Sequence, residues 1–277
     1  MTIEQVKKFW EENPLFVGEG MAEVGSKEWF EEWEKVYKED CLAGQSPEKI
    51  YTEGLTLDKK IIDIGCGPGF WVRYFLKFGF RNLSACDLTE QAVNLTKKSL
   101  SLYGLDKYPV EIKIGNAEDL PYENETFDHV NCQGVIHHTP NTEKCIEEFY
   151  RVLKPNGSLC FSVYYNFFLL RKPFLLKIVS LILAQFIGLS GRGRESILSS
   201  GNPQEIVRTY DGSDNPVGKA FTLIEIENML IGLFKIVKKR RTFFPARALP
   251  FKIPKKMHLW LHNKHGLLIV LRAVKKS

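Results

Sequence analysis

The sequence has little of what would mark a disulfide scaffold, a zinc protein or a membrane-spanning protein. Its six cysteines form neither a C-x-x-C pair nor a His/Cys ligand spacing, so we expect reduced structural thiols and no metal site. The N-terminus has no apolar core after a basic start, which predicts a cytoplasmic protein. The longest uncharged run, Ile178 to Gly191, is shorter than the ~20 residues that a helix needs to cross a bilayer.

Acidic residues are scarce in the second part of the chain. From Phe161 onward there are six Asp and Glu against 20 Lys and Arg, whereas residues 1–160 carry 27 acidic and 18 basic residues. The formal net charge of +5 conceals this gradient. A basic region of this kind attracts phosphate, anionic lipid or nucleic acid, or is simply a solvated surface. The length of 277 residues, 44% of them hydrophobic, suffices for one large domain or two small ones.

What the chain does contain is a strand that runs into a glycine-rich loop. The short apolar run Lys60–Ile64 is rich in Ile and fits the first central strand of a parallel sheet. Gly65, Gly67 and Gly69 follow, and they lack the Cβ atoms that would keep a ligand from the backbone. Helically spaced aromatic residues come next. Strand, loop and helix together predict a nucleotide site, although such a short motif also occurs as an ordinary glycine turn.

The spacing around the loop favours a cofactor with an amino acid moiety over NAD. The third glycine comes one residue earlier than in the dinucleotide pattern G-x-G-x-x-G. Asp63 would repel a pyrophosphate but can pair with an ammonium group. Asp87 ends the second predicted strand, about 20 residues past the loop, where a carboxylate hydrogen-bonds ribose hydroxyls. Asp87 could instead serve only the cap of the next helix, which we expect at Thr89.

Four segments in order over residues 60–164 resemble the class I S-adenosylmethionine-dependent methyltransferases of the small-molecule type. Asp63–Gly69 resembles motif I of that family, and Gly115–Pro121 resembles its adenine-binding turn. Leu153–Gly157 is similar to the turn before its fifth strand. The resemblance implies that S-adenosyl-L-methionine is the cofactor. The residues expected at the cofactor are Asp63, Gly65, Cys66, Gly67, Gly69, Asp87, Leu88, Asn116, Ala117 and Gln133.

The family fold implies an α/β architecture with a Rossmann-like, seven-stranded sheet. We expect the sheet to be mostly parallel with an antiparallel final strand, helices on both faces and helical cap insertions. Residues 57–164 and 221–277 form the predicted core, residues 1–56 an N-terminal helical lid, and residues 165–220 a cap inserted into the core. Within these, Ser46 is expected to cap a short helix, and Thr222 and Glu225 form a capping box.

The acceptor is expected at the carboxyl edge of the sheet, where ligands of open α/β sheets bind. His137 and His138 follow the fourth predicted strand, and either could be the general base for an oxygen acceptor. Either could also be a packed or capping residue, and carbon or nitrogen acceptors need no base. Tyr164, Tyr165 and Phe168 would form an aromatic wall, and Arg171 could hold an anion. These residues favour a small apolar or lipid-like acceptor with an anionic group.

Two other functions stay open. The basic second part of the chain would suit an RNA methyltransferase, although no aromatic and basic nucleic-acid motif is visible, so we consider nucleic acid the less favoured partner. The second open function is that of a non-catalytic scaffold protein that binds S-adenosylmethionine, because a protein can keep a fold without the catalytic activity associated with it. The apolar segment 167–189 has basic residues at both ends. It predicts either a buried or capping helix, or an interfacial helix in peripheral contact with an anionic membrane.

Overall fold

The computed structural model describes residues 1–15, 22–166, 202–244, 246 and 251–276. The predicted interfacial segment 167–189, with Phe168 and Arg171, lies outside these residues. The α-helices of the described part are α1 (Ile3–Glu12), α2 (Lys27–Asp40), α3 (Phe70–Phe78), α4 (Glu90–Leu102), α5 (Thr142–Val152), α7 (Pro203–Tyr210), α8 (Leu223–Leu230) and α9 (Lys255–His265). Shorter turns of helix are η1 (Glu48–Thr52) and η2 (Ile136–His138).

One mixed sheet forms the centre of the molecule. Its strands are β1 (Ile61–Ile64), β2 (Leu83–Asp87), β3 (Val110–Ile114), β4 (Phe127–Gln133), β5 (Leu153–Tyr165), β6 (Ala220–Phe221), β7 (Phe234–Thr242) and β8 (Leu268–Lys275). The order is β3-β2-β1-β4-β5-β8-β7, and β8 is antiparallel to both of its neighbours. The predicted Rossmann-like sheet with an antiparallel final strand is confirmed. The described sheet has eight strands rather than seven because the two-residue β6 also pairs with β5.

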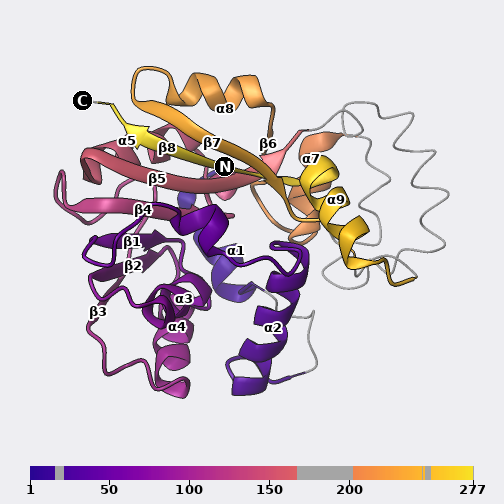
Figure 1. The fold of residues 1–277 in the computed structure, drawn as a ribbon, viewed down its shortest axis with the longest axis horizontal. Helices are drawn as coiled ribbons and strands as arrows, with labels where there is room; N and C mark the ends of the chain where they lie inside the picture. The colour runs from indigo at the N-terminus through magenta and orange to yellow at the C-terminus, as the bar shows by residue number, and fades with distance from the viewer. Residues whose placement is uncertain (16–21, 167–201, 245, 247–250, 277) are drawn as a thin grey trace.

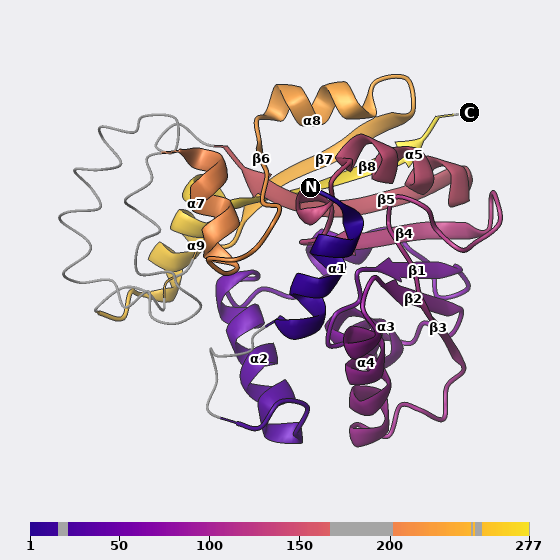
Figure 2. The same cartoon turned by 180° about the vertical axis from the view of Figure 1, so that it is seen from behind.

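Helices cover both faces of the sheet, and each face has its own apolar core. One core joins the sheet to α5 and α8 through residues such as Phe149 and Ile226. The other joins it to α2, α3 and α4 through residues such as Trp33, Phe75 and Leu95. Figures 1 and 2 show α5 and α8 on the side of the sheet away from α3 and α4. All four residues of β1 are buried and three of them are Ile, which fits a strand that is covered on both faces.

Of the helix N-caps predicted from the sequence, two are confirmed and one is wrong. Thr89 caps α4, and Thr222 and Glu225 form the expected capping box of α8. The predicted cap at Ser46 is wrong: only the single turn η1 forms there, behind Pro47 and without a side-chain cap. The capping signal was outweighed because five residues are too few to form the hydrogen bonds that offset the cost of helix nucleation.

α7 and α9 lie together at one end of the sheet, far from the chain's C-terminus (Figures 1 and 2). α7 belongs to the predicted cap insertion, and α9 falls between the two final strands. α1 and α2 lie next to this end, beneath the carboxyl ends of the central strands. The elements that differ from a plain nucleotide-binding sheet therefore gather around the edge at which ligands of such sheets bind.

Candidate active site

The glycine loop between β1 and α3 uses its three glycines for different purposes. All three have positive φ, at 70° for Gly65, 49° for Gly67 and 80° for Gly69. A Cβ on Gly65 would lie 2.2 Å from a methyl group of Val135, and one on Gly69 would lie 2.9 Å from the hydroxyl of Ser99. A Cβ on Gly67 would meet nothing within 4 Å. Gly65 and Gly69 thus permit close packing, whereas Gly67 presents bare backbone to open space.

Asp87 ties the loop to the start of α4. Its Oδ2 accepts the N–H of Gly67 at 3.0 Å, and its Oδ1 accepts both the N–H and the hydroxyl of Thr89 at 3.0 Å. Burial raises the pKa of the Asp87 carboxyl, and these hydrogen bonds oppose that shift. A carboxylate has about four acceptor sites, so one remains for a ligand hydroxyl. Asp87 therefore orders the loop and the helix cap and can still bind a ribose.

Asp63 belongs to a buried polar chain that leads toward the sheet edge. Its Oδ1 accepts from Asn131 Nδ2 at 2.7 Å, and Asn131 Oδ1 accepts from Gln133 Nε2 at 2.9 Å. Asp63 Oδ2 and Gln133 Oε1 are buried and have no hydrogen-bond partner within the part of the chain that the structure describes. Burial raises the pKa of Asp63 to about 7. Two unfilled acceptors at this position suit a ligand that carries N–H donors.

A first cavity of about 870 Å³, open to solvent, lies over the loop. Seven of the ten residues expected at the cofactor line it: Gly65, Gly67, Asp87, Leu88, Asn116, Ala117 and Gln133. α1 closes the other side with Ile3, Val6 and Trp10. These three residues fall within the predicted lid of residues 1–56, but the sequence did not single them out as cavity residues, because a helical aromatic stripe looks the same whether it packs on a core or over a cavity.

The other three expected residues lie beneath the cavity. Cys66 is 5% exposed, and the Thr96 hydroxyl lies 3.4 Å from its sulfur, so its side chain belongs to the core. Gly69 lies at the contact of α3 with α4. Asp63 is 2% exposed and reaches the cavity only through Asn131 and Gln133. All six cysteines are free thiols.

A second cavity of about 840 Å³ adjoins the first. Both are lined by Trp10, Leu15, Gln133, Gly134 and His138. The remaining lining of the second cavity is largely aromatic or apolar, with two acids, and includes Trp33, Tyr37, Asp40, His137, Tyr164, Tyr210, Asp211 and Phe243. Of the predicted acceptor wall, Tyr164 lies here. Tyr165 does not line it, because successive strand residues face opposite sides, and its hydroxyl accepts from Arg241 at 3.1 Å.

The two histidines have different surroundings. His138 lies at the boundary of the two cavities, with Nδ1 at 2.8 Å from the carbonyl of Val217 and Nε2 at 3.3 Å from Asp211 Oδ2. The Tyr164 hydroxyl donates to the same Asp211 oxygen at 2.8 Å. His137 is 1% exposed, and its burial lowers the pKa of the ring well below the usual value. The geometry distinguishes His138 as the ring with a carboxylate partner.

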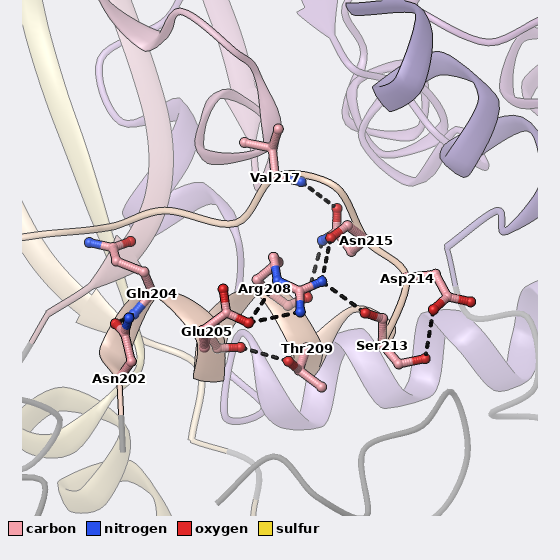
Figure 3. A network of polar contacts seen from close by, with 9 residues as sticks. All are labelled: Asn202, Gln204, Glu205, Arg208, Thr209, Ser213, Asp214, Asn215 and Val217. Carbon is pink, nitrogen blue, oxygen red and sulfur yellow. Dashed lines mark hydrogen bonds and ion pairs between the residues drawn. The ribbon is translucent and has the colours of Figure 1, made fainter. Parts of the chain in front are cut away.

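The loop after α7 is held in shape by Arg208. Figure 3 shows its guanidinium between the Glu205 carboxylate, at 2.8 Å, and the carbonyls of Ser213 and Asn215, at 2.8 and 2.7 Å. Asn215 Oδ1 in turn accepts the N–H of Val217 at 3.2 Å. This network fixes the loop that delivers the polar neighbours of His138: Asp211, the Val217 carbonyl and Asn215, whose Nδ2 lies 3.4 Å from His138 Nδ1. The sequence could not show it, because the partners of His138 lie more than 70 residues along the chain.

Comparisons with known proteins agree with this geometry. Residues 62–161 match the family model described as a methyltransferase domain. A 2-methyl-6-phytyl-1,4-hydroquinone methyltransferase of Oryza sativa subsp. japonica is 33% identical over 46% of this chain and 36% of its own length. A sterol 24-C-methyltransferase of Schizosaccharomyces pombe is 32% identical over 41% of this chain and 29% of its own. The chain thus spans about a third of the length of these curated relatives.

Solved structures share the fold over nearly the whole chain. A methyltransferase of Methanosarcina mazei, described as dependent on S-adenosylmethionine, has a TM-score of 0.55, with 22% identity over 80% of this chain and 94% of its own. The [4+2]-cyclase SpnF has a TM-score of 0.57, with 14% identity over 100% and 97%. At sequence identities of 22% and 14%, the similarity shows a shared fold and nothing more specific.

Residues 62–161, about a third of the chain, are thus similar to methyltransferase domains, and the chain shares its fold with a solved methyltransferase described as dependent on S-adenosylmethionine, which is the cofactor of that class. Among the described residues, no helix has the length and apolar character needed to cross a membrane.

Proposed function

We propose that this protein transfers a methyl group from S-adenosylmethionine to a small, apolar or lipid-like acceptor held in the second cavity. The observation that carries the proposal is that Gln133, Gly134 and His138 line both cavities. A donor bound in the first cavity and an acceptor in the second would meet at these residues. Holding two reactants in line is the largest task of an enzyme whose donor is already reactive.

The residues of the first cavity fit this cofactor. The bare backbone at Gly67 leaves room for it, and the spare acceptor site of Asp87 suits a ribose hydroxyl. Asn116 and Ala117 lie where the adenine turn is expected. The unfilled oxygen of Gln133, which lines the cavity, suits an amino group, and the Asp63 carboxyl lies behind it through Asn131. When bound, S-adenosylmethionine supplies a sulfonium-activated methyl group, so the protein needs no metal or covalent step.

His138 is placed to take the proton of an acceptor hydroxyl. The Val217 carbonyl holds the proton of its neutral ring on Nδ1, which leaves Nε2 as the acceptor. Once Nε2 is protonated, the imidazolium lies 3.3 Å from the Asp211 carboxylate. Tyr164 keeps this carboxylate oriented through its own hydrogen bond. We assign His138, rather than His137, as the general base for methyl transfer to an oxygen acceptor.

The lining of the second cavity supports an apolar acceptor. Its rings include Trp33, Tyr210 and Phe243, and the two curated relatives named above act on a phytyl hydroquinone and on a sterol. The described lining carries the carboxyls of Asp40 and Asp211 but no Lys or Arg. An anionic group on the acceptor would therefore rely on Arg171, outside the described residues.

The test is a labelled-methyl transfer screen with apolar hydroxyl compounds, hydroquinones and sterols among them. The wild type is compared with His138→Gln and with His265→Gln, which changes an exposed histidine of α9. We expect His138→Gln to lower the transfer rate at least 100-fold, since a general base contributes about 10²–10⁴, and to bind the cofactor as the wild type does. A wild type that binds the cofactor but methylates no acceptor would favour the scaffold reading.

A further inference from the structure

α9 presents an apolar stripe to solvent. Met257 is 41% exposed and Trp260 is 53% exposed, and the spacing of three residues places both on one side of the helix. Phe251, just before the helix, is 62% exposed. The opposite side of α9 is anchored: His262 is fully buried, and His258 Nε2 lies 3.1 Å from the carbonyl of Phe244. The stripe is thus fixed in orientation by contacts on its back.

Exposed lysines accompany this stripe: Lys256 and Lys264 lie on its side of α9 and Lys252 just before the helix, whereas Lys255 lies on the anchored side, next to Gly44. Lys252, Lys255, Lys256 and Lys264 are all exposed, and the ammonium of Lys264 lies 5.2 Å from the centre of the Trp260 ring. The last acidic residue of the sequence is Glu227, and 13 lysines and arginines follow it. Within the described part of the chain, none of the four lysines has a carboxylate at ion-pair distance. The surface is therefore apolar at its centre and positively charged around it.

This combination matches an anionic bilayer better than a nucleic acid. Tryptophan is favoured at the headgroup level of a membrane, and lysines extend their charged ends toward anionic headgroups. Single-stranded nucleic acid needs a groove in which several rings stack on successive bases. α9 is a projecting helix with one exposed tryptophan beside methionine and phenylalanine side chains.

The anchored side of α9 lies close to the second cavity. Phe243 lines that cavity, and the carbonyl of the next residue, Phe244, is the one that contacts His258 of α9. Figures 1 and 2 place α9 beside α7 at the same end of the sheet. A bilayer contacting α9 would face the end of the molecule at which the cavity wall is built.

We propose that α9 and Phe251 form a surface that binds anionic lipid bilayers, with Trp260 in the headgroup layer and Lys252, Lys256 and Lys264 against the anionic headgroups. The proposal concerns attachment and does not depend on the methyl transfer.

The test is co-sedimentation of the full chain with vesicles of phosphatidylcholine alone or with 30–40% phosphatidylglycerol (about the anionic fraction at which such attraction is strong). Each lysine near an anionic surface strengthens binding about fivefold. Lys256→Gln/Lys264→Gln should therefore lower partition to anionic vesicles about 25-fold, and Trp260→Ser should also lower it several-fold. The matched controls are Lys97→Gln/Lys144→Gln, which removes two exposed lysines elsewhere, and Ile231→Ser, which removes an exposed apolar residue of 70% exposure.

The proposal is supported if anionic vesicles bind the wild type, neutral vesicles bind it weakly, added salt weakens the binding and only the α9 variants reduce it. Equal binding by the α9 variants and the controls would overturn it, as would no binding to anionic vesicles. So would binding of single-stranded RNA that the α9 variants lose while vesicle binding is absent. Cofactor binding by every variant, measured in parallel, separates loss of attachment from loss of fold.

Discussion

Asp63 is a buried carboxyl whose charge the cofactor is expected to control. Without a ligand, burial holds its pKa at about 7, against an ordinary value of 3.8. An ammonium group in the cavity, at the Gln133 end of the hydrogen-bonded chain from Asp63 through Asn131, would favour the ionised form. Cofactor binding near pH 6 should then release a proton, because the protonated carboxyl ionises in the complex.

The same shift predicts how the stability of the ligand-free protein depends on pH. A carboxyl with a raised pKa stabilises the fold fully below pH 4, and this contribution is lost as the pH rises through 7. The total is roughly 4 kcal/mol. Asp63→Asn can still accept from Asn131 but does not ionise, so its stability should not fall as the pH rises through 7. The unfolding free energy of the variant should therefore increase relative to that of the wild type from pH 4 to 8. Denaturant unfolding at several pH values measures it, and a difference that stays constant over that range would contradict the prediction.

The site residues that the sequence predicted correctly are those that act through their backbone or that occur at a fixed spacing within the motif. Gly67 and Asp87 were identifiable because a loop that approaches a ligand needs glycine and because the acid follows at a set distance. Cys66 lay in the same motif, yet its side chain turns into the core. Asp211 could not be foreseen, since its role depends on a loop that returns to His138 from a distant part of the chain.

Among the elements, α1 is the one whose position the site depends on most. The Glu11 carboxylate accepts the N–H groups of Glu90 and Gln91 at 3.0 and 2.8 Å, at the first turn of α4. A carboxylate at a helix N-terminus is stabilised by the unpaired amides and by the helix dipole. This contact holds α1 against the first cavity, beside Asp87.

Glu11→Gln should therefore loosen α1 and speed release of the cofactor. Removing the charge from these two hydrogen bonds costs about 1.4 kcal/mol, which corresponds to about a tenfold faster dissociation. Stopped-flow dissociation of S-adenosylmethionine measures the rate. Glu12→Gln, which changes the exposed neighbouring acid, is the control and should leave the rate unchanged. Identical rates for Glu11→Gln and wild type would show that α1 does not retain the cofactor.

The elements that the sequence predicted well are those with a strong local pattern. β1 and α3 follow from the local hydrophobic pattern, whereas the antiparallel final strand follows from the family resemblance. The docking of α1 through Glu11 and of α9 through His258 involves single polar contacts between distant segments. Such contacts leave no periodic signal, so the sequence suggested helical segments but not what they cover.

For the molecule as a whole, the central claim is that the glycine loop and Asp87 form a site for S-adenosylmethionine. The charge gradient fits this arrangement, because the acidic first part of the chain holds the cofactor side and the basic second part holds α9. Under the proposed function, the two adjoining cavities would connect the donor site with the acceptor site.

Calorimetric titration with S-adenosylmethionine and with NAD tests this claim most directly. The wild type should bind S-adenosylmethionine and not NAD, and Asp87→Asn should bind S-adenosylmethionine at least tenfold more weakly, since the variant loses a charge-assisted acceptor at the loop. Asp106→Asn, an exposed acid in the loop after α4, should match the wild type, and thermal unfolding checks that each variant is folded. A wild type that does not bind S-adenosylmethionine, or an Asp87→Asn variant that binds it equally well, would contradict the account.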